Sequence, residues 1–86
     1  MTPAQRELAR HALGLPNAMR RSYRNRYFAP AAGECSEQWK AMVAAGEAEG
    51  GTPARKASSV FFCLTYKGAE LALEAGEHLC FEDFPR

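Results

Sequence analysis

The sequence has few of the features that mark secreted, disulfide-stabilised or membrane-spanning proteins. It holds only three cysteines, Cys35, Cys63 and Cys80, and an odd number without paired spacing argues against a disulfide scaffold. No uninterrupted apolar stretch approaches the ~20 residues of a membrane span, and the N-terminal MTPAQRELAR lacks the apolar region of a secretory signal. We therefore expect a soluble, cytoplasmic protein that does not enter a membrane.

Recognised motifs for metal binding and catalysis are also missing. No C-x-x-C or H-x(3–5)-H spacing supports a zinc site, and the nearest pattern is His78 and Cys80, two positions apart. Gly50-Gly51-Thr52 lacks the lysine of a phosphate-binding loop, and neither His11 nor His78 stands at a known spacing from a nucleophile. The sequence therefore predicts no enzyme, no metal and no cofactor.

Length and charge bound what remains. Eighty-six residues with 47% hydrophobic content suit a single domain over residues 1–86 with one modest core. The net charge is +1, but residues 1–33 hold six arginines against Glu7 alone, whereas residues 34–86 hold five basic and nine acidic residues. Such a division predicts either a basic binding face or two halves that attract each other.

Caps and apolar spacing predict two helices in the first half of the chain. Residues 2–13 begin with a capping box of Thr2 and Gln5, and Gly14 ends the helix. A second helix is predicted over residues 36–46, with Ser36 as its N-cap. The predicted core takes apolar residues from these helices and from later segments: Leu8, Trp39, Met42, Phe62, Leu64 and Leu71.

Residues 16–34 allow two interpretations. Met19, Tyr23 and Tyr27 are spaced by four, as on a helix, but the tyrosines also alternate with arginines, as on a strand. The segment Ala29–Gly33 contains proline and glycine and is expected to break whatever precedes it. We expect a short helix or turn followed by an irregular basic connection.

Residues 47–64 are typical of a hairpin that leads into a third helix. A short strand begins at Ala48, a long polar tip follows, and residues 60–64 return as a β-rich strand in which Cys63 is expected to be a small core residue. Thr65 is then a good N-cap, and Gly68 allows the new helix to approach another backbone closely. This helix is expected to end at Gly76, before a last strand or extended arm.

The stretch WKAMVAAGEAEG…VFFCLTYKGAELAL resembles the second half of winged-helix regulators of the MarR type. In those proteins a helix ends in glycine, a wing hairpin follows, and the returning strand runs into L-T-x-x-G-x-x-x-L. Leu64, Thr65, Gly68 and Ala72 occupy that pattern here. The resemblance implies an α+β fold: a small winged helix-turn-helix-like domain with three or more helices and a β-hairpin wing.

The whole chain also resembles small uncharacterised proteins of bacteriophages and prophages. These are similar in carrying A-L-G-L, S-Y-R-N-R-Y/F, W-x-x-M-V-x-x-G and F-x-L-T-x-x-G, which match residues 12–15, 22–27, 39–46 and 62–68. This resemblance implies a phage or prophage origin and the cytoplasm of a bacterial host. It implies no particular activity.

The winged-helix resemblance implies binding residues in two places. Helix 36–46 would present Gln38 and Lys40 to the bases of DNA, and the wing tip would add Arg55 and Lys56. Glu37 makes this helix a poor candidate for DNA binding, because a carboxylate near phosphates opposes the electrostatic part of DNA affinity.

A stronger positive surface is predicted in residues 20–26. Arginine interleaved with tyrosine suits both phosphate contact with base stacking and a protein interface. The residues concerned are Arg20, Arg21, Tyr23, Arg24 and Arg26.

Two functions stay open on the sequence alone. The favoured one is a small regulatory protein that binds nucleic acid through these arginines and the wing. The alternative is a phage accessory protein that binds and modulates a host or phage protein complex, for example as an inhibitor of defence or transcription. The apolar tail, residues 79–84, also offers a surface for a homodimer.

Overall fold

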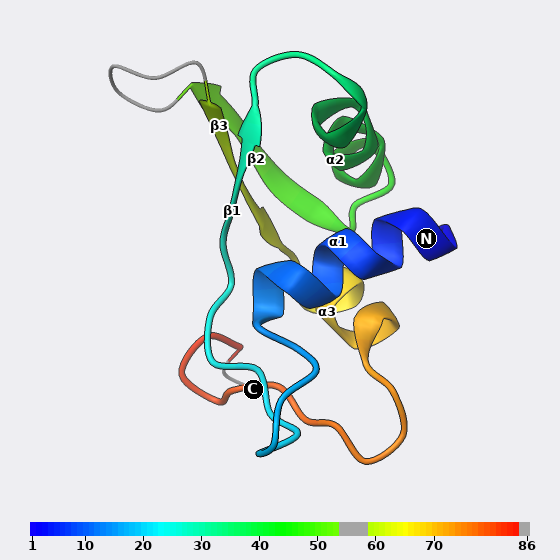
Figure 1. The fold of residues 1–86 in the computed structure, drawn as a ribbon, viewed down its shortest axis with the longest axis vertical. Coiled ribbons are helices and arrows are strands. Elements are labelled where there is room, and N and C mark those ends of the chain that lie inside the picture. The colour runs from blue at the N-terminus through cyan, green and yellow to red at the C-terminus, as the bar shows by residue number, and fades with distance from the viewer. Residues whose placement is uncertain (54–58, 85–86) are drawn as a thin grey trace.

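A computed structural model describes residues 1–53 and 59–84 of the chain. These residues form three helices and one antiparallel sheet of three strands (Figure 1). The elements, in chain order, are α1 (Pro3–Leu13), β1 (Tyr27–Pro30), α2 (Glu34–Ala44), β2 (Ala48–Pro53), β3 (Ser59–Leu64) and α3 (Tyr66–Ala72). The predicted small α+β fold is confirmed. None of the helices in these two ranges has the length and apolar character of a membrane span.

The predicted caps of α1 are confirmed. The Thr2 hydroxyl accepts a hydrogen bond from the Gln5 backbone N–H at 3.2 Å, and the Gln5 side chain accepts one from the Thr2 N–H at 3.0 Å. Gly14 ends the helix with φ +80°, a conformation that favours glycine. Any larger residue at this position is also excluded sterically, because a Cβ at Gly14 would collide with the ring of Tyr23.

The prediction for residues 16–34 missed a strand. Residues 20–26 do form an irregular connection, but β1 follows it and pairs antiparallel with β3, with Tyr27 opposite Phe62 and Pro30 opposite Ser59. The sheet order is β1-β3-β2, so β1 is an edge strand. Proline is tolerated at the end of an edge strand because it need not donate to a second neighbour, so β1 includes Ala29 and Pro30 and then ends within the segment predicted to break it.

Helix α2 begins two residues before the predicted cap. Gly33 is its N-cap, and Glu34 and Glu37 lie in the first turn, where carboxylates interact favourably with the helix dipole. The prediction that Ser36 caps this helix was wrong, because Ser36 lies inside the helix and is fully buried. Trp39 lies in the core, as predicted, with no exposed surface.

The predicted hairpin and the capped third helix are confirmed. Strands β2 and β3 pair with Ala48 opposite Leu64, and the register shifts between Gly50 and Thr52. The predicted site residues Arg55 and Lys56 at the tip lie outside the described residues.

Thr65 and Gly68 explain how β3 passes directly into α3. The Thr65 hydroxyl accepts from the Gly68 N–H at 3.2 Å and donates to the Gly46 carbonyl at 2.8 Å. A Cβ at Gly68 would collide with the Glu47 carbonyl, so glycine lets α3 pass close to the start of β2. The helix ends at Ala72, earlier than predicted, and residues 73–84 contain one bridge, from His78 to Arg21, and no strand.

Thr65 provides a first stability prediction. Thr65→Ala removes both hydrogen bonds of the hydroxyl and should lower the free energy of unfolding by about 0.5–2 kcal/mol, the usual loss of an N-cap. Thr65→Ser keeps both bonds and should be nearly neutral. Urea denaturation followed by tryptophan fluorescence measures the difference. Equal losses in the two variants would show that packing of the threonine methyl group matters and the cap does not.

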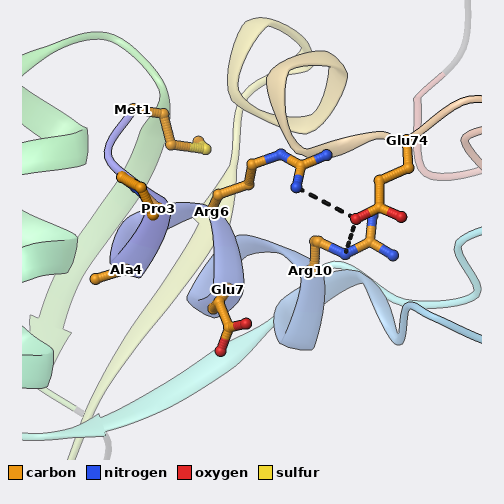
Figure 2. Close-up of a pocket in the computed structure, with 7 residues that line it drawn as sticks. All are labelled: Met1, Pro3, Ala4, Arg6, Glu7, Arg10 and Glu74. Carbon is orange, nitrogen blue, oxygen red and sulfur yellow. Dashed lines mark hydrogen bonds and ion pairs between the residues drawn. The ribbon is translucent and has the colours of Figure 1, made fainter.

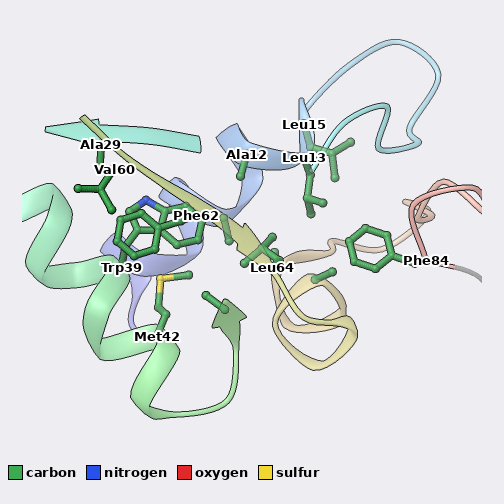
Figure 3. Packing of buried hydrophobic residues seen from close by; sticks show 14 residues of the cluster. Ala12, Leu13, Leu15, Ala29, Trp39, Met42, Val60, Phe62, Leu64 and Phe84 are labelled. Atoms are coloured by element: carbon green, nitrogen blue, oxygen red, sulfur yellow. The ribbon is translucent and has the colours of Figure 1, made fainter. Parts of the chain in front are cut away.

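The core lies between the sheet and the helices (Figure 3). The Trp39 ring stacks on Phe62, with ring centroids 5.4 Å apart and planes 14° from parallel. Most of the predicted core is confirmed, and Leu8 packs at its edge. The prediction that Leu71 lies in the core was wrong. Leu71 is 47% exposed, because Ala69 and Ala72 form the face of α3 that packs inward.

The other face of the sheet carries apolar side chains that no helix in the described chain covers. All three helices lie on one side of the sheet (Figure 1), and β3 alternates between buried and half-buried residues. Phe61 and Cys63 are half-buried on the uncovered side, so Cys63 is not the core residue that was predicted. Phe28 on β1 is 57% exposed.

Candidate functional site

Ion pairs divide the six arginines of the first half into two groups. Arg6 and Arg10 of α1 bind carboxylates of the acidic second half, and Figure 2 shows Glu74 between them. Arg6 Nη1 lies 3.3 Å from Glu74 Oε2, whereas Arg10 binds Glu77 through Nη1 at 2.5 Å and Nη2 at 2.7 Å. Part of the basic half is therefore used to hold the acidic half in place.

The other four arginines form the basic stretch, residues 20–26. Within residues 1–53 and 59–84, none of these four lies within 4.0 Å of a carboxylate. The members of this group are Arg20, Arg21, Arg24 and Arg26. Their charges are therefore available to an external anion.

The backbone of the basic stretch is held at both ends by hydrogen bonds. At its start, the Arg20 carbonyl accepts from the His78 N–H at 2.8 Å, and the Ser22 N–H donates to the His78 carbonyl at 2.9 Å. At its end, the Asn25 side chain bonds both the N–H and the carbonyl of Leu64, at 2.8 and 3.0 Å, and so extends the ladder of β3. The arginines thus project from a fixed segment.

Ser22 and Asn25 were missed as structural residues of this site. Ser22 is buried, and its hydroxyl accepts from the Cys80 N–H at 2.7 Å. In the sequence both stood among arginines and tyrosines as ordinary polar residues. Only partners more than 35 positions away show what they do.

Arg24 and Tyr23 form a pair at the end of α1. Arg24 Nε and Nη2 donate to the His11 carbonyl at 3.2 and 2.7 Å, and its guanidinium lies 5.3 Å from the centre of the Tyr23 ring. A cation over an aromatic face is a favourable arrangement. Tyr23 is 63% exposed and so remains available for stacking.

Tyr27, by contrast, is half-buried and packs against the core. Its ring contacts Trp39 and His11, with centroids 5.3 and 5.4 Å away. The Cys35 thiol donates to its hydroxyl at 3.4 Å. Once that thiol ionises, the Tyr27 O–H donates to the sulfur instead, and this hydrogen bond, together with burial and the charge of the sulfur, raises the pKa of Tyr27 to about 12. Tyr27 is therefore half-buried against the core and is not one of the freely exposed aromatic rings of the basic stretch.

Two of the arginines also meet the edge of the sheet. A shallow hollow of about 300 Å³ is lined by side chains from α1, the basic stretch and β1: His11, Arg24, Arg26, Tyr27 and Phe28. Arg24 and Arg26 thus lie beside the exposed Phe28. This joins part of the basic stretch to the uncovered face of the sheet.

The predicted binding residues of α2 lie elsewhere. Gln38 accepts a hydrogen bond from the Gln5 side chain at 3.0 Å, near the start of α1, whereas Arg24 lies against the end of that helix. Lys40 is exposed, and its Nζ lies 3.7 Å from Glu37. Its charge is therefore partly compensated within α2.

Metal ligands do not cluster in the part of the chain that the structure describes. No group of three His, Cys, Asp or Glu side chains there is placed to hold a metal ion, and this includes the neighbourhood of His78 and Cys80. Comparison of the chain with protein-family models, with curated proteins and with solved structures finds no match.

Proposed function

We propose that this protein binds nucleic acid through the basic stretch. The observation that carries the proposal is the set of four arginines without a carboxylate partner in the described residues, on a backbone anchored to α1, β3 and the segment after α3. Arginine contacts to phosphate supply the sequence-independent part of nucleic-acid affinity. Tyr23 adds an exposed aromatic ring beside those charges.

A more specific version of this proposal is that the protein binds nucleic acid in the manner of a winged helix. The hairpin of β2 and β3 and the capped helix after it support it. Two features argue against α2 as the helix that contacts the bases. Its first turn carries the carboxylates of Glu34 and Glu37. In the described chain it is preceded by a strand, β1, and not by a helix. We therefore place the phosphate contacts on the basic stretch and give Gln38 and Lys40 a minor part.

The alternative is an accessory protein that binds a host or phage protein. Its support is the number of large apolar side chains on the surface, since these are enriched in protein interfaces. Met19 is 82% exposed and Phe81 71% exposed. In such an interface one or two residues would dominate the affinity.

The salt dependence of binding tests the proposal. Each of the variants Arg20→Ala, Arg21→Ala, Arg24→Ala and Arg26→Ala should weaken binding of duplex DNA about equally for any sequence. Each should also reduce the slope of log affinity against log salt by about one. Fluorescence anisotropy with a labelled duplex measures both quantities. Lys67→Ala is the matched control, because it removes one exposed positive charge on α3, and it should leave the slope unchanged.

The four-fold alanine variant decides between the outcomes. If it stays folded by circular dichroism and still binds DNA at full strength, the basic stretch is not the site. If Tyr23→Ala or one arginine variant alone abolishes binding to a co-purified protein, the accessory-protein alternative replaces the proposal.

A further inference from the structure

Phe28 and Phe61 form an aromatic pair on the uncovered face of the sheet. They lie directly opposite each other on β1 and β3, with ring centroids 5.4 Å apart and planes 58° apart. Phe28 is 57% exposed and Phe61 is half-buried. The outer face of an antiparallel sheet is usually polar, so two phenylalanines side by side call for an explanation.

Core stability does not explain the pair. The core packs on the opposite side of β3, through Val60, Phe62 and Leu64. Burying a phenylalanine side chain contributes about 1.5–3 kcal/mol, and most of that is not gained by a ring as exposed as Phe28. The pair therefore offers apolar surface to something outside the described chain.

The charges around the pair indicate what that partner is. At the α1 end, Arg24 and Arg26 line the same hollow as Phe28. On β2, Glu49 is exposed opposite Cys63. The pKa of that thiol is raised by burial and, to a smaller extent, by the Glu49 carboxylate. An anionic chain would therefore lie across Phe61 and Phe28 at the β1 edge of the sheet, beside Arg26 and Arg24, and not at the β2 edge, where Glu49 lies.

We infer that the ligand is a single-stranded nucleic acid whose bases stack on Phe28 and Phe61 while its phosphates contact Arg24 and Arg26. This inference rests on the proposed function and adds the class of nucleic acid. Aromatic rings beside a positive surface suit single strands, because exposed bases present flat faces for stacking. In a duplex these faces are covered by the neighbouring base pairs, so the pair gains nothing there.

The test compares single and double strands directly. The probes are labelled dT12 and the same strand annealed to dA12, measured by fluorescence anisotropy at one salt concentration. Wild-type protein should prefer dT12. Phe28→Ala and Phe61→Ala should each weaken dT12 binding by about 5-fold to 150-fold, the range for loss of one stacked base. They should leave duplex binding and the salt slope unchanged, because no charge is removed.

Two further variants separate stacking from folding. Phe28→Tyr keeps an aromatic ring and should bind dT12 about as tightly as the wild-type protein. Leu71→Ala removes another side chain that is about half exposed, on α3, and should change nothing.

Three results overturn the inference. If duplex and dT12 bind equally and only the arginine variants weaken them, the proposed function stands and the single-strand inference fails. If wild-type protein binds neither probe, both fail. If light scattering shows a dimer that Phe28→Ala converts to a monomer, the aromatic pair is an interface between two copies of this chain.

Discussion

Replacing Trp39 with alanine is expected to lower the free energy of unfolding by about 3–5 kcal/mol. The ring has no exposed surface and joins two parts of the core, since it stacks on Phe62 and contacts Tyr27 at 5.3 Å. Truncation removes both contacts and leaves a cavity that rigid neighbours fill only in part. A loss of this size is a large fraction of the 5–15 kcal/mol that stabilises a typical domain.

Trp39→Phe is the matched control. It keeps an aromatic ring against Phe62 and removes the indole N–H, which is buried and has no hydrogen-bond partner among the described residues. Because an unsatisfied buried donor costs about 1–3 kcal/mol, this variant should lose much less stability than the alanine variant. Urea denaturation followed by circular dichroism at 222 nm compares the two. Similar losses would show that the ring stack is not what Trp39 contributes.

Replacing Glu77 with glutamine is expected to cost about 3–5 kcal/mol at pH 7, the usual result of removing one partner of a buried ion pair. The side chains of Arg10 and Glu77 are only 10% and 7% exposed, and the guanidinium also donates to the Ala72 carbonyl at 2.9 Å. Without the Glu77 carboxylate, the buried Arg10 charge keeps the Ala72 carbonyl, a neutral amide and the exposed Glu74 carboxylate, which lies 3.9 Å away. Glu74→Gln is the control, because Glu74 is 57% exposed and exposed pairs contribute about 0–1 kcal/mol.

The same ion pair makes stability depend on pH. The hydrogen bonds from Arg10 lower the pKa of Glu77 from 4.5 to about 2, against the opposing effect of burial. Because the folded-state pKa lies below the unfolded one, the contribution of Glu77 is fully present above about pH 5 and is lost as the pH falls toward 2. The stabilities of the parent protein and Glu77→Gln should therefore converge over that range. Urea midpoints measured between pH 7 and pH 2 test this, and a constant difference would contradict it.

The sequence by itself determined the features that depend on neighbours three or four residues apart. The capping box of Thr2 and Gln5 and the cap of Thr65 on the Gly68 N–H are set by local spacing. The hairpin of β2 and β3 likewise follows from a polar tip between a short strand and a β-rich strand. The helix and strand boundaries set by these signals were the accurate ones. Where a cap was chosen by residue type alone, at Ser36, the helix began elsewhere.

Only the tertiary structure decided the features whose partners are distant in the chain. Strand β1 is four residues long and ends in proline, so its own residues do not favour a strand, and its hydrogen bonds come from β3 about 30 positions later. The pairing of Phe28 with Phe61 depends on the same register.

The division of the arginines is also a property of the folded chain. The sequence places Arg10 in a predicted helix and Arg20 in a connection, but it does not show which of the two is paired. The packing of α1 brings Glu77 to Arg10 and no described carboxylate to Arg20. Charge patterns along a sequence show how many cations there are. Folding determines which of them are neutralised, because ion pairs form between groups that packing brings within a few ångströms, regardless of their separation along the chain.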